Sequence, residues 1–422
     1  MPARPRIPEQ RSTVHINLPA IRHNAKVLRD FLRGTSAGTS RIIRPAGLCA
    51  VLKGDAYGLG AVEVARVVGP YAQLFAVYDE AQMRELLREI KTSVPILVLM
   101  PTYRLRNSEL VEEAMRTQSV HLTIHSPLQL GLLADVAKRR GWNIRVHVEV
   151  DTGMSRAGCS LQEAPSLLRR IRDLNGQFTL SGIFTHFNTA ASDPAFTIKQ
   201  HLKFQRLLRD TAPLIPPGCL VHEANTLAAI ASRHYHQNLV RMGLGLAGFG
   251  PEALSGRSIL PPGSLRPSVT WTSWVSHVQR IPRGAAVGYD SLWKSKRPTW
   301  VGSIPVGYGD GFPRAVSRLP LGKPAKVAVF FGGRGELRRV YCPVIGAVNL
   351  DQISVDLTDA VNVGIRSGVN VGVFSKVELI SPDPSAPNHL PELARRAGTI
   401  AHELLTNLRL HPCRKYVRTV KC

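Results

Sequence analysis

The chain has few cysteines and no long apolar run. Its six cysteines are scattered over 422 residues without a CxxC pair. We therefore predict neither a disulfide framework nor a metal site, and a reducing compartment is indicated. No apolar stretch approaches the length that spans a bilayer, and the opening segment MPARPRIPEQRST lacks the apolar core of a signal peptide. We expect a soluble, cytoplasmic protein with no membrane partner.

Acidic residues are also scarce. The sequence has 30 Asp and Glu against 54 Lys and Arg, which gives a formal net charge of +24. Such a balance often accompanies binding to nucleic acids or anionic surfaces. Here most of the basic residues are scattered singly, and neither a zinc-finger pattern nor a basic region accompanies them. Charge alone supports a nucleic-acid partner only weakly, and we do not expect one.

The sequence does contain a regular alternation of strand-like and helix-like segments. A chain of 422 residues exceeds what one hydrophobic core normally serves, so we expect two domains. Ser126-Pro127 and Asp193-Pro194 are typical helix starts, and Gly141 is a typical helix end. Strands alternating with helices predict an α/β fold, a (β/α)8 TIM-type barrel, with a doubly wound sheet as the alternative. The eight strand segments are 47–53, 74–78, 94–100, 121–125, 145–150, 181–187, 220–225 and 239–246.

The second part of the chain differs in composition and in its predicted secondary structure. Proline and glycine cluster in residues 254–267. Short β-rich segments follow with few helices between them, and only residues 390–408 have a helical pattern. We predict a barrel domain at residues 1–258 and a C-terminal mostly-β domain at residues 259–422.

Polar side chains occur where the barrel strands are expected to end. Lys53 ends the first segment, His186 lies near the end of the sixth, and Arg241 lies in the eighth. The loops at these strand ends form the active site of such barrels. A desolvated lysine there has a lowered pKa and can form a Schiff base, most often with pyridoxal phosphate. A surface lysine and a hydrogen-bonded core histidine are the ordinary explanations, but the coincidence on one rim favours a site.

The segment RMGLGLAGFG offers a candidate anion site. Gly243, Gly245 and Gly248 spell G-x-G-x-x-G, but no helix is expected to open after them, so a dinucleotide fingerprint is only weakly indicated. Two interpretations remain open. The loop can present bare N–H groups to a phosphate, or its glycines can serve close packing at barrel closure.

Taken in order, the motifs resemble those of the alanine racemase family. They are AVLKGDAYGLG, VDTGMSRAG, GIFTHFNTA, HEANT, VRMGLGLAGFGP, VGYDSLW, PVGYGDGFPR and GAVNLDQISVDLTD. The resemblance implies a pyridoxal 5'-phosphate enzyme in which Lys53 holds the cofactor and acts as one base. It implies that Tyr289 is the other base, supplied to the partner subunit of a homodimer with shared active sites. The remaining implied contacts are Tyr57, His186, Asn225, Thr226, Arg241, Gly243 and Leu244 to the cofactor, and Arg156, Leu350 and Asp351 to the substrate.

Departures from the family pattern leave the substrate open. A lysine that the family usually carries seven residues before Arg156, commonly carbamylated, is Glu149 here. We interpret Glu149 as a built-in carboxylate behind the site, with pairing to another interior group as the alternative. Ala347 and Leu350 replace an Arg and a Met of the family pattern, which bears on substrate preference.

The resemblance implies a small amino-acid substrate and the interconversion of L- and D-alanine, supplying D-alanine for peptidoglycan. Three alternatives remain. They are a racemase of serine or of several amino acids, a pyridoxal-phosphate-binding protein without turnover, and a decarboxylase of the same architecture, which the racemase-like motifs around Tyr289 and Arg241 disfavour.

Overall fold

The computed structural model describes residues 8–34, 45–250, 257–317, 324–332, 337–408 and 413–419. The chain divides into two compact units. The first, Ala20–Arg266, is called the barrel unit below. The second combines Met1–Pro19 with Pro267–Cys422 and is called the β unit.

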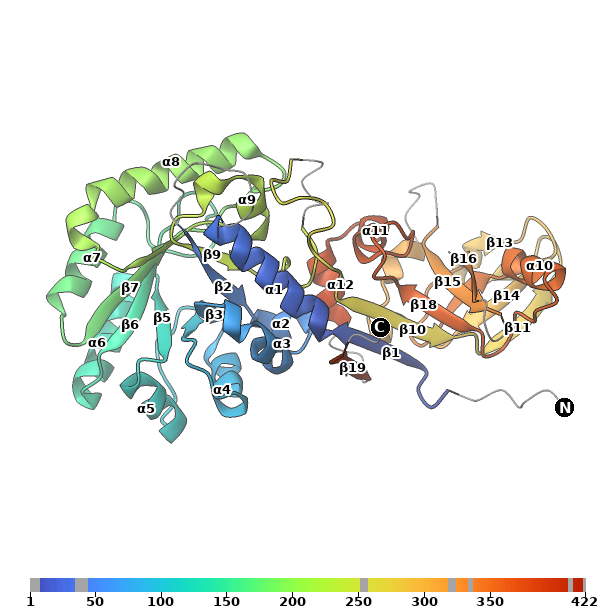
Figure 1. Cartoon of the computed structure of the whole chain (residues 1–422), viewed down its shortest axis with the longest axis horizontal. Helices are drawn as coiled ribbons and strands as arrows, with labels where there is room; N and C mark the ends of the chain where they lie inside the picture. The colour runs from blue at the N-terminus through green and yellow to red at the C-terminus, as the bar shows by residue number, and fades with distance from the viewer. Residues whose placement is uncertain are drawn as a thin grey trace. The chain divides into compact units, whose positions relative to one another are not determined.

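The barrel unit confirms the predicted (β/α)8 fold (Figure 1). Its eight strands are parallel and follow the order β8-β7-β6-β5-β4-β3-β2-β9. The ring closes where the Asn238 N–H donates to the Val221 carbonyl at 3.3 Å and the Arg241 N–H donates to the Ala224 carbonyl at 3.1 Å. Each strand overlaps one predicted segment. The strands are β2 (Gly47–Val51), β3 (Leu74–Val77), β4 (Ile96–Val98), β5 (Val120–Ile124), β6 (Ile144–Glu149), β7 (Phe178–Phe184), β8 (Leu220–His222) and β9 (Leu239–Met242).

Helices cover the outside of this barrel (Figure 1). The predicted helix ends are confirmed: Ser126 accepts from the Gln129 N–H, Asp193 accepts from the Phe196 N–H, and Gly141 takes a left-handed φ of 66°. The helices are α1 (Leu18–Arg33), α2 (Lys53–Gly58), α3 (Ala61–Val68), α4 (Glu80–Glu89), α5 (Glu109–Arg116), α6 (Pro127–Arg140), α7 (Ala164–Asp173), α8 (Pro194–Asp210) and α9 (Thr226–Ala231).

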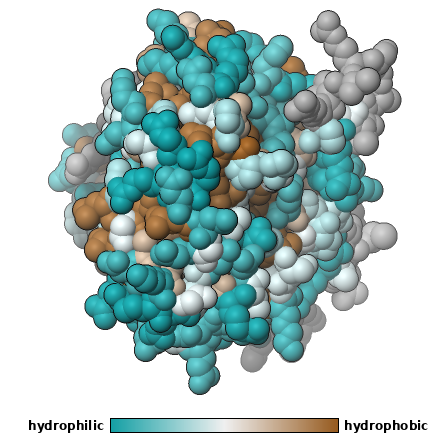
Figure 2. All heavy atoms as spheres, turned by 90° about the vertical axis from the view of Figure 1, so that its left-hand side faces the viewer, coloured by the Kyte–Doolittle hydropathy of each residue, from teal (hydrophilic) through white to brown (hydrophobic). Residues whose placement is uncertain are grey.

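The outer surface of the barrel unit is mostly hydrophilic on the side of α6 to α8, with apolar side chains between (Figure 2). Leu128 and Leu132 are exposed on α6, and Ile198 and Leu202 on α8. Each pair is spaced by one helical turn. Within the described ranges, no helix has the length and apolarity needed to cross a bilayer.

The β unit is built on a sheet whose order, for the described residues, is β11-β14-β17-β16-β15-β18-β10-β1-β19. A small hairpin of β12 and β13 stands apart from it. The strands are β1 (Ser12–Asn17), β10 (Val269–Trp274), β11 (His277–Ile281), β12 (Ala286–Val287), β13 (Trp293–Lys294), β14 (Thr299–Ile304), β15 (Lys326–Phe331), β16 (Arg338–Ile345), β17 (Ile353–Asp356), β18 (Lys376–Ile380) and β19 (Arg414–Val417).

The division of the chain differs from the predicted boundary at residue 258. The structure groups residues 1–19 with the β unit and residues 259–266 with the barrel unit. The reason is strand pairing: β1 lies between β10, with which it is antiparallel, and β19, with which it is parallel. A single strand ahead of a barrel carries no local signal of the distant strands that it joins.

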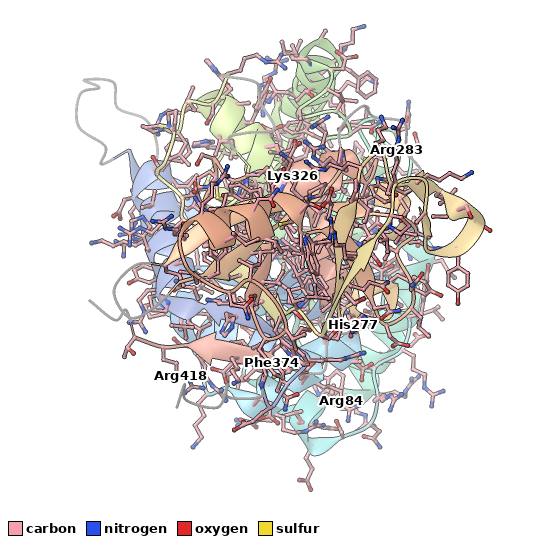
Figure 3. The ribbon with its side chains drawn as sticks, turned by 90° about the vertical axis from the view of Figure 1, so that its right-hand side faces the viewer. Arg84, His277, Arg283, Lys326, Phe374 and Arg418 are labelled. Atoms are coloured by element: carbon pink, nitrogen blue, oxygen red, sulfur yellow. The ribbon has the colours of Figure 1, made fainter. Side chains whose placement is uncertain are left out.

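Two local predictions in the β unit were wrong. Residues 358–366 form a helix, α10 (Thr358–Arg366), which was not expected. Residues 369–375, one of the segments predicted as β-rich, form no strand; Phe374, labelled in Figure 3, has a φ of 71° just before β18 begins. The helical pattern predicted for 390–408 is present as two helices, α11 (Leu390–Arg396) and α12 (Ala401–Asn407), separated at Gly398 with a φ of 67°.

Candidate active site

Lys53 lies at the C-terminal end of a barrel strand, as predicted. It follows β2 by two residues and begins α2. Partial burial lowers the pKa of its amino group, and the positive charges of Arg156 and Arg241 lower it further, against the opposing charge of Glu149. These influences favour a neutral amine, the form that acts as a nucleophile or a base.

The turn after Lys53 is left-handed. Gly54, Asp55, Ala56 and Tyr57 have φ values of 64°, 59°, 52° and 58° with ψ between 36° and 47°. Each non-glycine residue in this region costs about 1–2 kcal/mol. The Asp55 carboxylate supports the turn by accepting from the Ala61 N–H at 2.8 Å. Such strain is typical of functional sites that the surrounding structure holds in place.

The turn carries Tyr57 against the loop that follows β9. A Cβ atom added at Gly243 would lie 2.3 Å from the Tyr57 ring, so only glycine permits this approach. The Thr226 hydroxyl accepts from the N–H groups of Gly243 at 3.3 Å and Gly245 at 3.4 Å. Hydroxyl and backbone N–H groups of this kind suit a phosphate. Asn225 caps α9 instead, accepting from the Ala228 N–H at 3.0 Å, and Leu244 is buried.

Arg241 is buried and its guanidinium is held from several directions. Nη1 donates to His222 Nδ1 at 2.7 Å, and Nη2 donates to the Thr185 carbonyl at 2.8 Å and to His186 Nδ1 at 3.1 Å. Because arginine only donates, both histidines accept at Nδ1. Burial lowers the pKa of His186 and of His222 well below the usual value, and Arg241 is the next cause for each. His186 is therefore a neutral ring beside a cation.

Glu149 lies beside His125 rather than in a bond to Arg156. Its Oε2 is 3.2 Å from His125 Nδ1, without the alignment of a hydrogen bond. Burial raises the pKa of Glu149, although the positive charges of Arg241, Arg156 and Lys53 act to lower it. Burial lowers the pKa of His125 to about 4. Among the described Lys, Arg and His side chains, only His125 lies within 4.0 Å of the Glu149 carboxylate.

Arg156 is exposed on the loop after β6. Asp151 orders this loop by accepting from the N–H groups of Gly153 at 2.8 Å and Met154 at 2.9 Å. The carboxylate thus shapes the segment that presents Arg156 at the rim.

Tyr289, Leu350 and Asp351 belong to the β unit, where they line one open pocket. Tyr289 is 68% exposed. It follows Gly288, whose φ is 75°, and precedes Asp290, whose φ is 59°, so a tight turn presents its ring to solvent. The structure thus collects the predicted residues into two groups, one on the barrel rim and one in this pocket.

Sequence reasoning missed several polar residues around both groups. Tyr308 and Arg314 line the pocket beside Tyr289, and the Arg314 guanidinium lies 5.6 Å from the Tyr308 ring centre. Both occur in the motif PVGYGDGFPR. The barrel interior also contains His125 and His147, whose signal was alternation, since HLTIH and RVHVEV place every second residue on the same face of a strand.

The fold and the rim define a class: an enzyme with a reactive lysine at the mouth of a (β/α)8 barrel, followed by a β domain. A family model described as "Alanine racemase, N-terminal domain" matches residues 16–251, and "Alanine racemase, C-terminal domain" matches residues 268–416. The chain belongs to the alanine racemase family, whose members are isomerases that depend on pyridoxal phosphate.

Individual relatives match along nearly the whole chain. The alanine racemase of Lactobacillus delbrueckii subsp. bulgaricus is 30% identical over 399 residues, which is 93% of this chain and 94% of that protein. The crystal structure of the E. faecalis alanine racemase superposes with a TM-score of 0.74 at 26% identity, over 97% of this chain and 98% of that one. The Bartonella henselae alanine racemase, solved with covalently bound pyridoxal phosphate, shares the fold with a TM-score of 0.74 at 24% identity over 96% and 99%.

Proposed function

We propose that this protein is a cytoplasmic, pyridoxal-phosphate-dependent alanine racemase that supplies D-alanine for peptidoglycan. The observation that carries the proposal is Lys53, which stands at a barrel strand end with its pKa lowered by burial and by two arginines. Family membership supports the reaction type. A reducing compartment agrees with Cys49, Cys159, Cys219 and Cys342, which are buried thiols outside any disulfide.

The rim has the chemistry that pyridoxal phosphate requires. Lys53 provides the amine that binds it, and its phosphate is assigned to Tyr57, Thr226 and the backbone of Gly243 and Leu244, where only glycine at position 243 leaves room for the Tyr57 ring. Arg156 and Arg241 place positive charge close to the Lys53 amine, which favours an anionic ligand at the rim. When bound, the cofactor acidifies the substrate α-proton by accepting its electron pair.

His186 and Arg241 are assigned to the ring of the cofactor. Their mutual hydrogen bond of 3.1 Å fixes His186 as a neutral acceptor at Nδ1 and leaves Arg241 a permanent cation. Asn225 contributes indirectly, by capping the helix that begins with Thr226. Arg156 on the ordered loop, together with Leu350 and Asp351 beside Tyr289, is assigned to the amino-acid substrate.

Racemisation requires a proton to leave one face of the α-carbon and another to arrive on the opposite face. We assign these roles to Lys53 Nζ and Tyr289 Oη. One atom takes the proton, the other gives one, and the number of protons on the enzyme is unchanged. The 68% exposure of Tyr289 on its own chain supports a homodimer in which each β unit supplies this tyrosine to the partner's barrel rim.

The decisive experiment is deuterium uptake at the α-carbon. The cofactor-loaded enzyme is incubated in heavy water with each enantiomer of alanine, serine, lysine and arginine, and both isotope and chirality are assayed. Exchange with inversion from either enantiomer of alanine is expected. If serine or one of the longer amino acids is turned over preferentially, that amino acid and not alanine is the substrate. A racemase of serine or of several amino acids is the second candidate function, because Leu350 is exposed beside Tyr289.

Two variants sharpen the result. Tyr289→Phe should keep exchange of one enantiomer and lose inversion, and Lys53→Ala should lose covalent cofactor binding. Absence of exchange with every substrate, despite a cofactor that borohydride fixes to Lys53, would leave a binding protein without turnover.

A further inference from the structure

Three buried histidines continue the hydrogen bonding of Arg241 through the barrel interior. Arg241 Nη1 donates to His222 Nδ1 at 2.7 Å, His222 Nε2 lies 2.9 Å from His147 Nδ1, and His147 Nε2 lies 2.9 Å from His121 Nδ1. His222 and His147 are 0% exposed and His121 is 4% exposed. We call these three side chains the histidine relay.

The direction of the relay is fixed by its first member. Arginine has no acceptor, so His222 Nδ1 is unprotonated and its proton is on Nε2. The Nε2–H of His222 then donates to His147 Nδ1, and the Nε2–H of His147 donates to His121 Nδ1. One donor-only residue thus sets the tautomer of all three rings, and a single flipped ring would oppose two donors or two acceptors.

The relay runs between the two ends of the barrel. His222 ends β8 on the side of the rim, His147 is the fourth residue of β6, and His121 is the second residue of β5, beside Arg145 in register. His121 and Arg145 both line a pocket formed by residues that precede the barrel strands, at the end opposite the rim. Barrel interiors are usually filled by Val, Ile and Leu. A polar chain here is exceptional.

We propose that the histidine relay positions Arg241, and that His147 and His121 act on the catalytic rim through it although neither reaches the rim. This inference rests on the proposed function of Arg241 at the cofactor ring. Each neutral ring that donates onward becomes a better acceptor, so the bond that holds Arg241 is strengthened by the next one along the chain. The guanidinium is thereby fixed in one orientation toward the rim.

The charges around the relay keep its rings neutral. Burial lowers the pKa of His147 and of His222 well below the usual value, and burial together with Arg145 lowers the pKa of His121 to about 3. Arg241 lies at one end and Arg145 at the other, so each end faces a cation. A protonated ring would leave two N–H groups facing each other.

The test follows 15N-labelled histidines of the enzyme by NMR, with pyridoxal phosphate bound and after its reversible removal. We expect three rings that carry their proton on Nε2 and do not titrate between mildly acidic and neutral pH. Removing the cofactor should shift His222 most and His121 least. In His147→Phe, removal should still shift His222 but no longer His121.

A matched control and a second variant distinguish the loss of a relay contact from misfolding of the variant protein. His236→Phe replaces another buried histidine, bonded to the Ala229 carbonyl outside the relay, and should leave the response of His121 intact. His121→Phe removes only the last ring. This substitution should lower kcat about two- to fourfold with KM unchanged, because it removes the strengthening that one hydrogen bond of the chain gives to the next.

Two results overturn the proposal: a proton on Nδ1 of any relay ring in the wild type, or a His121 response that persists in His147→Phe. Failure of racemisation is a separate outcome. If no amino acid is racemised but the relay still responds to the cofactor, the proposed function falls and the relay stands.

Discussion

Glutamine at position 149 keeps the size of Glu149 but cannot ionise, so it tests which form of this side chain the protein uses. His125 Nε2 lies 3.1 Å from the Leu99 carbonyl, which only accepts, so the proton of a neutral ring is on Nε2. Nδ1 then presents a lone pair to Glu149 Oε2 at 3.2 Å. A lone pair of His125 Nδ1 facing a carboxylate oxygen at 3.2 Å disfavours the ionised form of Glu149, which is the direction in which burial raises the pKa of this carboxyl. Burial also lowers the pKa of His125 to about 4, so the imidazole is expected to stay neutral.

The magnitude follows from linkage. A carboxyl whose folded pKa is raised stabilises the fold most below its unfolded pKa of about 4.3, and this contribution is lost as the pH rises through the folded pKa. The loss amounts to at most about 1.4 kcal/mol per pH unit in that window. Glu149→Gln escapes it. We expect the free energy of unfolding of the variant to rise relative to that of the wild type as the pH rises. Because Glu149 makes no aligned hydrogen bond to His125, kcat/KM should stay within about threefold, less than the loss of a typical net hydrogen bond of about 1 kcal/mol.

The assay is urea denaturation of both proteins over a pH series, together with racemase kinetics. Glu223→Gln is the matched control: Glu223 is also buried with a raised pKa, but it accepts from Gln237 at 2.6 Å and pairs with His201 at 2.9 Å. The reasoning is refuted if Glu149→Gln loses more than about tenfold in kcat/KM while its stability deficit grows with pH. That result would restore the interpretation of Glu149 as a carboxylate that serves Arg156.

Three further perturbations have definite expected outcomes. Gly243→Ala puts a Cβ 2.3 Å from the Tyr57 ring and should weaken pyridoxal phosphate binding at least about tenfold in an absorbance titration, with circular dichroism unchanged. Gly182→Ala puts a Cβ 2.1 Å from His147 Nδ1 and should lower the free energy of unfolding by about 1–3 kcal/mol. An unchanged free energy of unfolding would show that the His147 ring can move aside without loss of stability. Removing pyridoxal phosphate should lower the free energy of unfolding by about 2.7 kcal/mol, compared with protein in which the free cofactor concentration is a hundred times its dissociation constant. An unchanged midpoint of thermal unfolding would contradict the cofactor assignment.

The barrel was predictable because its signals are local. Each strand segment is a short apolar run, and caps such as Ser126 mark the helices between them with side-chain bonds to nearby N–H groups. The β unit was less so. β1 joins its sheet through distant partners: His15 lies opposite Thr270, 255 residues away, and opposite Lys415, 400 residues away. Pairing at that separation leaves no mark on the local pattern.

For the site, the sequence located residues but not their contacts. Lys53, His186 and Arg241 were predicted at the rim because each lies in or at the end of a predicted barrel strand. The partner of Glu149 was not predicted, since His125 directly follows β5, the strand that pairs with β6. Only the register of β5 against β6 brings the two strands into line. Register between parallel strands depends on packing of the whole barrel rather than on either segment.

The left-handed turn after Lys53 shows why backbone propensities of single residues could not predict part of the site. Asp55, Ala56 and Tyr57 each favour a right-handed backbone, and together they oppose the turn by about 3–6 kcal/mol. The rest of the barrel must supply that energy, through contacts such as the Asp55 bond to Ala61 and the fit of Tyr57 against Gly243. A right-handed turn would carry Tyr57 away from Gly243 and Thr226. The strain therefore accompanies the one arrangement that gathers an amine, a phenol and a glycine loop at the same strand ends, which is the arrangement that the proposed chemistry needs.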